Sequence, residues 1–252
     1  MLEILNSLST RVKTGIVLII AMLIIGYIDS YFLFWLVFGI MLLISVSEAK
    51  NLYQLESNSI YIYITLLWFA VYFYPMPVDL IFIVAIGYAS QLAYKRKLDK
   101  KMFLPLLYPT ASFVFLMTLY SEFGSMVLLW LLVIVAATDI GAYFVGRTFG
   151  KTPFCETSPN KTLEGVVGGM ALAVILGTLT AISEIGILGA IIVSAVVSLS
   201  SVFGDLYESY LKREAGIKDS GNILPGHGGV LDRVDGYLFG AIVMTVLLRV
   251  II

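Results

Sequence analysis

Long apolar runs, interrupted by short polar breaks, fill this sequence from near its first residue to its last. A helix needs about 20 mainly apolar residues to cross the hydrocarbon core of a membrane. Runs that reach or approach this length are centred at 14–28, 31–47, 59–74, 78–94, 102–120, 125–146, 165–183, 185–205 and 236–252. The pattern therefore predicts an all-α, polytopic integral membrane protein with about nine transmembrane helices.

The composition agrees with a membrane protein. Only 13% of the residues are charged and 60% are hydrophobic, whereas soluble domains are about 25% charged. The net charge of −1 gives no electrostatic reason to expect nucleic-acid binding, and one cysteine excludes an internal disulfide. No small-residue cleavage site follows the first run, so we expect a retained first span and not a signal peptide.

The basic residues fall on one side if the N-terminus lies in the cytoplasm and the spans alternate. That side then holds 15 of the 16 Lys and Arg residues, most densely in KRKLDKK at 95–101, which we expect to contact anionic lipid heads. The opposite side holds acids alone: Asp29, Asp79, Glu122 and Glu184. The exception is Arg249, whose long side chain can snorkel to the surface. The positive-inside rule therefore predicts a cytoplasmic N-terminus.

Polar chemistry is confined to the C-terminal half of the chain. We therefore expect N-terminal scaffold spans at 1–130 and a C-terminal region at 131–252 that carries the chemistry. Two predicted cytoplasmic loops of this region, 147–164 and 206–235, are too long for simple turns. The stretch 208–235 alone holds nine of the 33 charged residues and the only histidine.

Two carboxylates lie within predicted spans, where they are expensive unless they find a cation, a donor or water. Asp139 is expected to face the interior of the bundle, and a structural contact between helices is the alternative. Asp205 follows Ser201 and precedes Glu208 and Lys212 at spacings that place all four on one helix face. This polar stripe is expected to lead from the membrane into the cytoplasm.

The GHGG segment at 226–229 and the following LDRVD form a second polar group. Glycines leave the backbone free to aim N–H groups at an anion. Asp232 and Asp235 share one face of the next helix, where they could also merely complement the helix dipole. Several carboxylates on one membrane side suit Mg²⁺, while a lone His227 is more often a hydrogen-bonding loop residue than a ligand.

The segment SPNKT at 158–162 precedes another predicted helix. Asn160 begins a glycosylation sequon, but the predicted cytoplasmic side argues against its use. Ser158 and Thr162 are candidate helix caps, and Lys161 beside the helix N-terminus makes a phosphate site; a capped loop without function is the alternative. Together these groups suit phosphoryl or nucleotidyl transfer at the membrane surface, with a lipid or lipid-soluble phosphate as one substrate.

The same segments resemble the signature of phosphatidate cytidylyltransferases, also called CDP-diacylglycerol synthases. The resemblance runs from residue 138 onward and rests on TDIGAYFVGRTFGK, SPNKTLEGVVGG, GDLYES and the pattern S-x-x-K-R, K-D-S-G, L-P-G-H-G-G, L-D-R-V-D. It implies that CTP and phosphatidic acid give CDP-diacylglycerol and pyrophosphate, with Mg²⁺ and K⁺ as a second cation. It also implies a homodimer in the cytoplasmic (inner) membrane with its active site facing the cytoplasm.

The candidate site residues fall into three groups. The expected catalytic residues are Asp205, Lys212, Lys218, Asp219, His227, Asp232 and Arg233. The expected substrate-binding residues are Arg147, Ser158, Asn160, Lys161, Thr162, Gly228 and Gly229. The expected metal ligands are Asp205, Asp232, Asp235 and Asp139.

Two other functions are compatible with intramembrane carboxylates. A transporter or channel for a divalent cation or phosphate would carry similar residues, but it should show internal repeats, which this sequence lacks. A CDP-alcohol phosphotransferase would need a closely spaced Asp/Gly/Arg motif in one helical hairpin, and no such motif is present.

Overall fold

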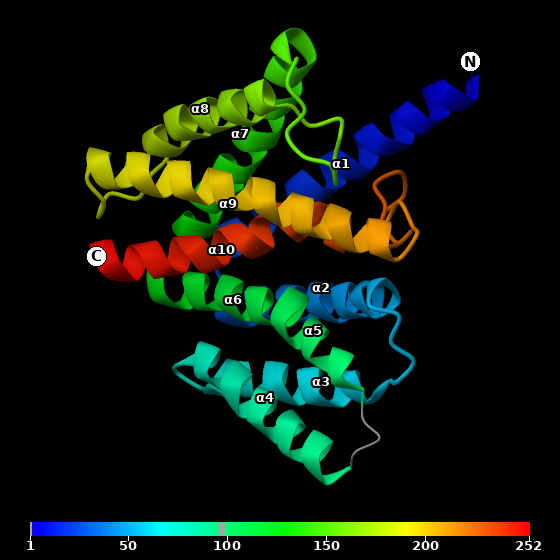
Figure 1. Ribbon diagram of the computed structural model, residues 1–252. Helices are drawn as coiled ribbons and strands as arrows, with labels where there is room; N and C mark the ends of the chain where they lie inside the picture. The colour runs from blue at the N-terminus through cyan, green and yellow to red at the C-terminus, as the bar shows by residue number, and fades with distance from the viewer. Residues whose placement is uncertain (1, 96–98) are drawn as a thin grey trace. The chain divides into compact units, whose positions relative to one another are not determined.

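The computed structural model describes residues 2–95 and 99–252, with side chains from residue 13 onward. Within these ranges the regular structure is helical, and the only bridges are isolated ones, Pro153–Thr162 and Leu224–Gly228. The helices are α1 (Leu2–Ile28), α2 (Tyr31–Leu52), α3 (Ser59–Phe73), α4 (Pro77–Tyr94), α5 (Phe103–Pro105), α6 (Ser112–Phe123), α7 (Ser125–Phe149), α8 (Leu163–Leu179), α9 (Ile187–Glu214) and α10 (Leu231–Ile251), with short η1 (Lys100–Met102) and η2 (Leu106–Ala111) before α6 (Figure 1).

The all-α prediction is confirmed for this part of the chain, and every predicted run is mainly helical. The run 165–183 extends beyond the end of α8 at Leu179, and the run 185–205 begins before α9 does at Ile187. Six segments of the described chain are long and apolar enough to cross a membrane: Tyr31–Leu52, Pro77–Tyr94, Lys100–Phe123, Ser125–Phe149, Ile187–Glu214 and Leu231–Ile251. Three apolar helices are shorter: Lys13–Ile28, Ser59–Phe73 and Leu163–Leu179. The chain is therefore a multi-pass membrane protein. The count of nine spans and the cytoplasmic N-terminus stay predictions, and residues 96–98 of the predicted lipid anchor lie outside the described residues.

The chain forms two compact units. Unit 1 contains the residues up to Thr118 and Glu214–Arg233, and unit 2 contains Leu119–Arg213 and Val234–Ile252. The 208–235 segment singled out by its charge thus contributes to both units. The predicted division at residue 130 separated scaffold from chemistry, and it stays a prediction.

Helix α3 of unit 1 shows how an almost wholly apolar helix can still have two faces. Its buried residues recur at helical spacing: Ile60, Ile64, Leu67 and Val71. Its exposed residues recur at the same spacing on the other face: Ile62, Leu66, Phe69 and Phe73. Since an exposed apolar stripe is unfavourable in water and suits hydrocarbon, this face is suited to contact lipid.

Helices α2 and α3 pack through a pair of tryptophans. The Trp35 indole nitrogen donates to the Trp68 carbonyl at 2.8 Å, and the Trp68 indole donates to the Trp35 carbonyl at 3.1 Å. Gly39 allows this approach, because a Cβ there would lie 2.3 Å from the Trp68 ring. Polar side-chain groups thus find partners between helices, as an apolar environment requires.

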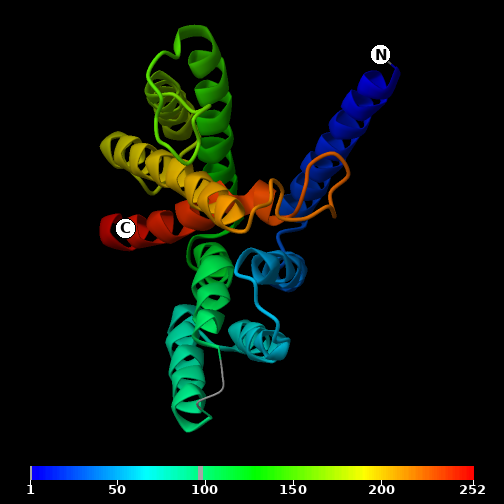
Figure 2. The same cartoon turned by 45° about the vertical axis from the view of Figure 1, so that its right-hand side comes forward.

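In unit 2, α7 and α8 run side by side (Figures 1 and 2). Small residues let their backbones meet: a Cβ on Gly169 would lie 2.5 Å from the Thr138 carbonyl oxygen, and one on Gly141 would lie 2.8 Å from the Gly169 Cα. Close backbone approach through small residues is a common way for membrane helices to pack. The backbones of α7, which carries the predicted site residues Asp139 and Arg147, and of α8 therefore lie in direct contact.

Helices α9 and α10 pack in the same way within unit 2. A Cβ on Gly204 would lie 2.5 Å from the Asp235 carbonyl oxygen, and the Tyr207 and Phe239 rings lie 5.7 Å apart. At the far end of α10, the Arg249 Nε donates to Glu122 at 2.8 Å. Arg249, the one basic residue that broke the predicted charge asymmetry, therefore forms an ion pair with Glu122, an acid that was predicted to lie on the same side of the membrane.

Candidate functional site

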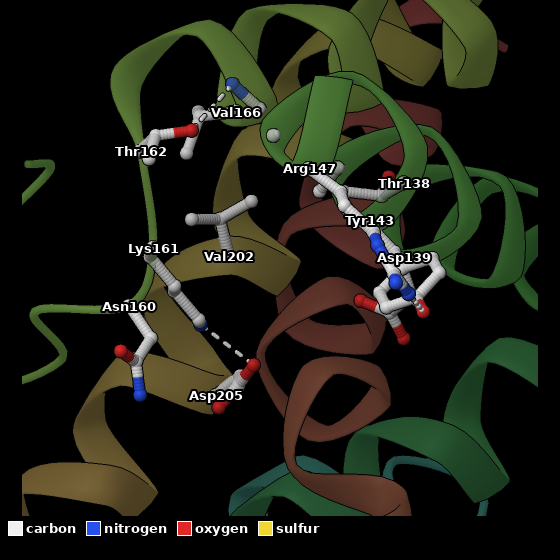
Figure 3. A pocket seen from close by; sticks show the side chains of 13 residues that line it. Thr138, Asp139, Tyr143, Arg147, Asn160, Lys161, Thr162, Val166, Val202 and Asp205 are labelled. Carbon is white, nitrogen blue, oxygen red and sulfur yellow. Dashed lines mark hydrogen bonds and ion pairs between the residues drawn. The ribbon is translucent and has the colours of Figure 1, made fainter. Parts of the chain in front are cut away.

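A cavity of about 520 Å³ lies in unit 2, among α7, the loop before α8, and α9 (Figure 3). This volume is within the range of small-molecule sites. Six of the predicted site residues line it: Asp139, Arg147, Asn160, Lys161, Thr162 and Asp205. Residues far apart in the sequence, from 139 to 205, therefore line one space, and their roles stay predictions.

An ion pair bridges the cavity. The Lys161 ammonium lies 2.6 Å from Asp205 Oδ2, and both side chains keep solvent access, at 27% and 38% exposure (Figure 3). Lys161 belongs to the loop before α8, whereas Asp205 lies on α9. A cation and a carboxylate in a partly open site can both exchange partners when a charged ligand enters.

The loop that carries Lys161 is fixed at both ends. Thr162 is the N-cap of α8, and its hydroxyl accepts from the Gly165 N–H at 3.1 Å, as the capping prediction required. The other candidate cap, Ser158, lies one turn earlier, where its carbonyl accepts from the Lys161 N–H.

Glu164 secures the far end of this loop. Its carboxylate accepts from the Lys151 and Thr152 N–H groups and from the Thr152 hydroxyl. The backbone N–H of Glu164 itself, and then these Lys151 and Thr152 donors, lower the pKa of Glu164 from 4.5 to about 2, because hydrogen bonds to the carboxylate stabilise its ionised form. The segment 153–161 thus lies between two fixed points, the Glu164 contacts at Lys151 and Thr152 and the N-cap at Thr162. Its residues Asn160 and Lys161 line the cavity.

The opposite wall of the cavity comes from α7. Arg147 Nη1 donates to the Tyr143 hydroxyl at 2.7 Å, and both side chains are exposed. Asp139 lies one turn before Tyr143 on the same wall (Figure 3). Sequence reasoning missed Tyr143. It lies four residues after Asp139 and four before Arg147, and this spacing places all three on one helix face.

The predicted polar stripe on α9 divides into buried and accessible parts. Ser201 and Glu208 are buried, Glu208 forms an ion pair with Lys212, and Asp205 opens to the cavity.

Asp235 of α10 accepts from its neighbouring Gly236 N–H and lies close enough to Asp205 and Asp139 to interact with their charges. Unit 2 thus gathers three of the four predicted metal ligands.

The fourth predicted ligand, Asp232, lies in unit 1. Its Oδ2 accepts from the Ser220 N–H at 2.9 Å, the Ser220 hydroxyl at 2.9 Å and the Gly229 N–H at 2.8 Å. Gly228 has a positive φ of 82°, and a Cβ there would lie 2.7 Å from this oxygen. The glycines do aim N–H groups at an anion, and in this structure that anion is the side chain of Asp232.

The rest of the 214–233 segment surrounds this arrangement. The exposed Arg233 donates through Nε to the His227 carbonyl at 2.8 Å, and the His227 ring lies 3.4 Å from the Pro225 carbonyl. Lys218 and Asp219 are exposed at its edge. His227 therefore takes part in the hydrogen bonding of its own loop, and the substrate roles of these residues stay predictions.

Unit 1 also contains a buried carboxylate that sequence reasoning missed. Glu48, near the end of α2, is 3% exposed and accepts from the backbone at the start of α10. A carboxylate beside an apolar run was the available signal.

The metal prediction can be tested against the donor chemistry. Among the residues with described side chains, no three His, Cys, Asp or Glu side chains form a ready metal-binding group. Asp205, Asp139 and Asp235 nevertheless supply carboxylate oxygens in one unit, and these are the donors that Mg²⁺ prefers. The donor type therefore fits the ion, and the set of ligands stays a prediction.

Comparison with known proteins gives the relationship of the whole chain. Two phosphatidate cytidylyltransferases, from two strains of Helicobacter pylori, are each 47% identical over 242 residues, which are 95% of this chain and 91% of theirs. The phosphatidate cytidylyltransferase of Bacillus subtilis is 45% identical over 122 residues, 47% of this chain and 45% of its own. The model of the cytidylyltransferase family matches residues 9–251, which extends the similarity beyond the segment from residue 138. The chain therefore belongs to the cytidylyltransferase family.

Proposed function

We propose that this protein is a phosphatidate cytidylyltransferase, which transfers CMP from CTP to phosphatidic acid and releases pyrophosphate. The observation that carries the proposal is the 47% identity, over 95% of the chain, to proteins of that name. The unit 2 cavity supports it, because cationic and carboxylate side chains line the same space. The transporter and phosphotransferase alternatives have no comparable support.

The reaction balances without an added oxidant or a covalent enzyme intermediate. A phosphate oxygen of phosphatidic acid forms a bond to the α-phosphorus of CTP. The bond from that phosphorus to the oxygen bridging to the β-phosphorus breaks, and pyrophosphate leaves with the electron pair. A phosphate monoester is already ionised at neutral pH, so the main barrier is the approach of two anions.

The residues of the cavity can lower that barrier by supplying positive charge. When CTP enters, Lys161 leaves Asp205 and binds a phosphate of the CTP triphosphate instead. Arg147 offers a planar set of donors on the opposite wall of the cavity. Preorganised charges directed at developing negative charge are the largest contribution in many enzymes of this kind. The ion pair with Asp205 thus keeps Lys161 oriented toward the position of the phosphates.

The freed Asp205 is then available to hold a cation, with Asp139 and Asp235 nearby. Mg²⁺ bound there would offset the charge of the phosphates and of the leaving pyrophosphate. We further propose, from the family resemblance, that K⁺ serves as the second cation and that Asp232 is also a metal ligand. Here this chain's carboxylates have the role of holding cations and not of removing a proton.

The location of the reaction follows from the substrates. Phosphatidic acid is a membrane lipid, and CTP is charged and water-soluble, so the site must be reachable from both phases. We propose that the protein acts as a homodimer in the inner membrane with its cavity reached from the cytoplasm. Val166 and Val202 give the cavity an apolar margin beside its charged groups, as a lipid phosphate requires.

The direct test uses the purified full-length protein in mixed detergent–lipid micelles containing phosphatidic acid. CTP is added with and without Mg²⁺, and both pyrophosphate and CDP-diacylglycerol are quantified. We expect equal amounts of the two products and activity only with the divalent ion. Absence of both products in the presence of Mg²⁺ would rule out the proposed reaction. Equal activity after chelation would remove only the metal requirement.

A further inference from the structure

Glu48 in α2 is a buried carboxylate whose described hydrogen-bond partners all lie more than 170 residues later in the chain. Its Oε1 accepts from the Val230 N–H at 2.9 Å, and its Oε2 accepts from the Leu231 N–H at 2.7 Å. The Ser220 hydroxyl lies 3.2 Å from Oε2. Glu48 therefore binds the N-terminus of α10, where helix N–H groups are otherwise unsatisfied and favour negative charge.

The 220–231 segment has a shape that depends on this carboxylate. A Cβ on Gly221 or Gly229 would lie 2.5 Å from Glu48 Oε1, so a side chain at either glycine would displace it. Val230 and Leu231, which donate to it, are themselves buried. The backbone thus encloses the Glu48 carboxylate closely, which is costly for a charge unless donors surround it.

Ser220 connects Glu48 to the predicted catalytic carboxylate. Its hydroxyl donates to Asp232 Oδ2 at 2.9 Å while it lies within reach of Glu48 Oε2. A hydroxyl carries one proton and two acceptor lone pairs, so it can serve only one ionised carboxylate as donor at a time. The position of Asp232 therefore depends on how Glu48 and Ser220 are arranged.

We propose that Glu48 is a positioning residue for the cytidylyl transfer, acting through Ser220 and the start of α10 to fix Asp232. The proposal rests on the proposed function, and it gives α2 a role beyond that of scaffold. Displacement of a reacting group by about 1 Å can lower a rate by about a hundredfold. Loss of Glu48 is therefore expected to act on turnover and not only on stability.

The decisive experiment compares Glu48→Gln, Ser220→Ala and the double variant with the wild-type protein in the micelle assay. Glutamine keeps the size of the side chain but presents an NH₂ group to a site built from donors. We expect kcat to fall about 10- to 100-fold in Glu48→Gln, with the KM for CTP changed much less. If Glu48 acts through Ser220, the double variant should lose little more than the worse single variant, because coupled residues are not additive.

Ser45→Ala is the matched control. Ser45 is also buried on α2, about one turn before Glu48, and its hydroxyl has no hydrogen-bond partner among the described residues. We expect this variant to keep wild-type kcat. Glu48→Asp, which retains the charge on a shorter arm, should recover part of the activity that Glu48→Gln loses.

The outcomes separate this proposal from the proposed function. An inactive wild-type protein contradicts the function itself. An active wild type with a folded Glu48→Gln variant that keeps its kcat, or with strictly additive losses in the double variant, overturns the positioning role. If Glu48→Gln is not recovered as a folded protein, Ser220→Ala decides: full kcat in that variant also overturns the role, and a drop in kcat supports it.

Discussion

Two of the predicted site carboxylates, Asp205 in unit 2 and Asp232 in unit 1, are held by different kinds of partner. Asp205 faces a lysine ammonium across a partly open cavity. Asp232 accepts two backbone N–H groups and a hydroxyl from a glycine-rich segment. The partner of Asp205 is one side chain with solvent access, whereas the partners of Asp232 are largely main chain.

This difference separates an exchangeable site from a fixed one. A lysine side chain can leave a carboxylate when a phosphate offers a better partner, and an exposed ion pair adds at most about 1 kcal/mol to stability. Backbone donors cannot leave unless the segment changes its conformation. Asp205 is therefore suited to change partners during turnover, and Asp232 to keep its place.

The largest effect is expected at the exchangeable carboxylate. Asp205→Asn should lower kcat by about a hundredfold or more, since removal of one preorganised charged group typically has this effect. Its thermal midpoint should move little, because the lost ion pair is partly exposed. Pyrophosphate release and a thermal melt measure the two quantities, with Glu184→Gln as a carboxylate control outside the cavity. Turnover near the wild-type rate would exclude Asp205 from the reaction.

Asp232→Asn tests the fixed carboxylate. We expect it to reduce turnover and also to destabilise the protein by about 1.5–3 kcal/mol, the range for hydrogen bonds to a charged group. The amide NH₂ would face donors that now approach Oδ2. Denaturation midpoints of this variant and of Asp205→Asn, measured together, provide the comparison. If the two variants are equally stable, the distinction between exchangeable and fixed carboxylates is wrong.

A smaller effect, on stability alone, is expected where α7 and α8 meet. Gly169→Ala places a Cβ 2.5 Å from the Thr138 carbonyl oxygen, which is backbone and cannot rotate away. Overpacking of this kind typically destabilises a protein by about 1–3 kcal/mol. Gly186→Ala is the control, because a Cβ there meets nothing within 4 Å. Equal thermal midpoints for Gly169→Ala and Gly186→Ala would show that α7 and α8 can move apart without loss of stability.

The smallest effect concerns pH and the loop that carries Lys161. The pKa of Glu164 is lowered from 4.5 to about 2 on folding. Its contribution to stability is therefore fully present above about pH 4.5 and is lost as the pH falls toward 2. The difference in thermal midpoint between wild type and Glu164→Gln should stay constant between about pH 7 and pH 5 and should shrink below pH 4.5. A difference that grows on acidification would contradict the proposed hydrogen bonding.

Much of unit 2 was predictable from the sequence because its signals are local. Asp205 lies on a periodic polar stripe, Thr162 precedes a helix as a cap, and Lys161 stands next to it. Helical spacing alone places such residues on a common face. The stripe could not reveal that Glu208 would be buried, since burial depends on which helix packs against it.

Unit 1 was less predictable because its decisive contacts are non-local. The glycines of GHGG predicted an anion held by backbone N–H groups, but not that Asp232 would be that anion. Glu48 was not singled out from the sequence, and its partners Val230 and Leu231 lie 182 and 183 positions away. No periodicity within one segment encodes a contact between two such distant segments.

The distance of Glu48 from its partners also has a consequence for biosynthesis. At roughly 5–20 residues per second, the 183 residues between Glu48 and Leu231 take roughly 10–40 s to be translated. Throughout that time the nascent α2 carries a carboxylate whose later donors do not yet exist. Lateral release of this helix into lipid is therefore opposed until Val230 and Leu231 have been translated, or until water or another group shelters the charge.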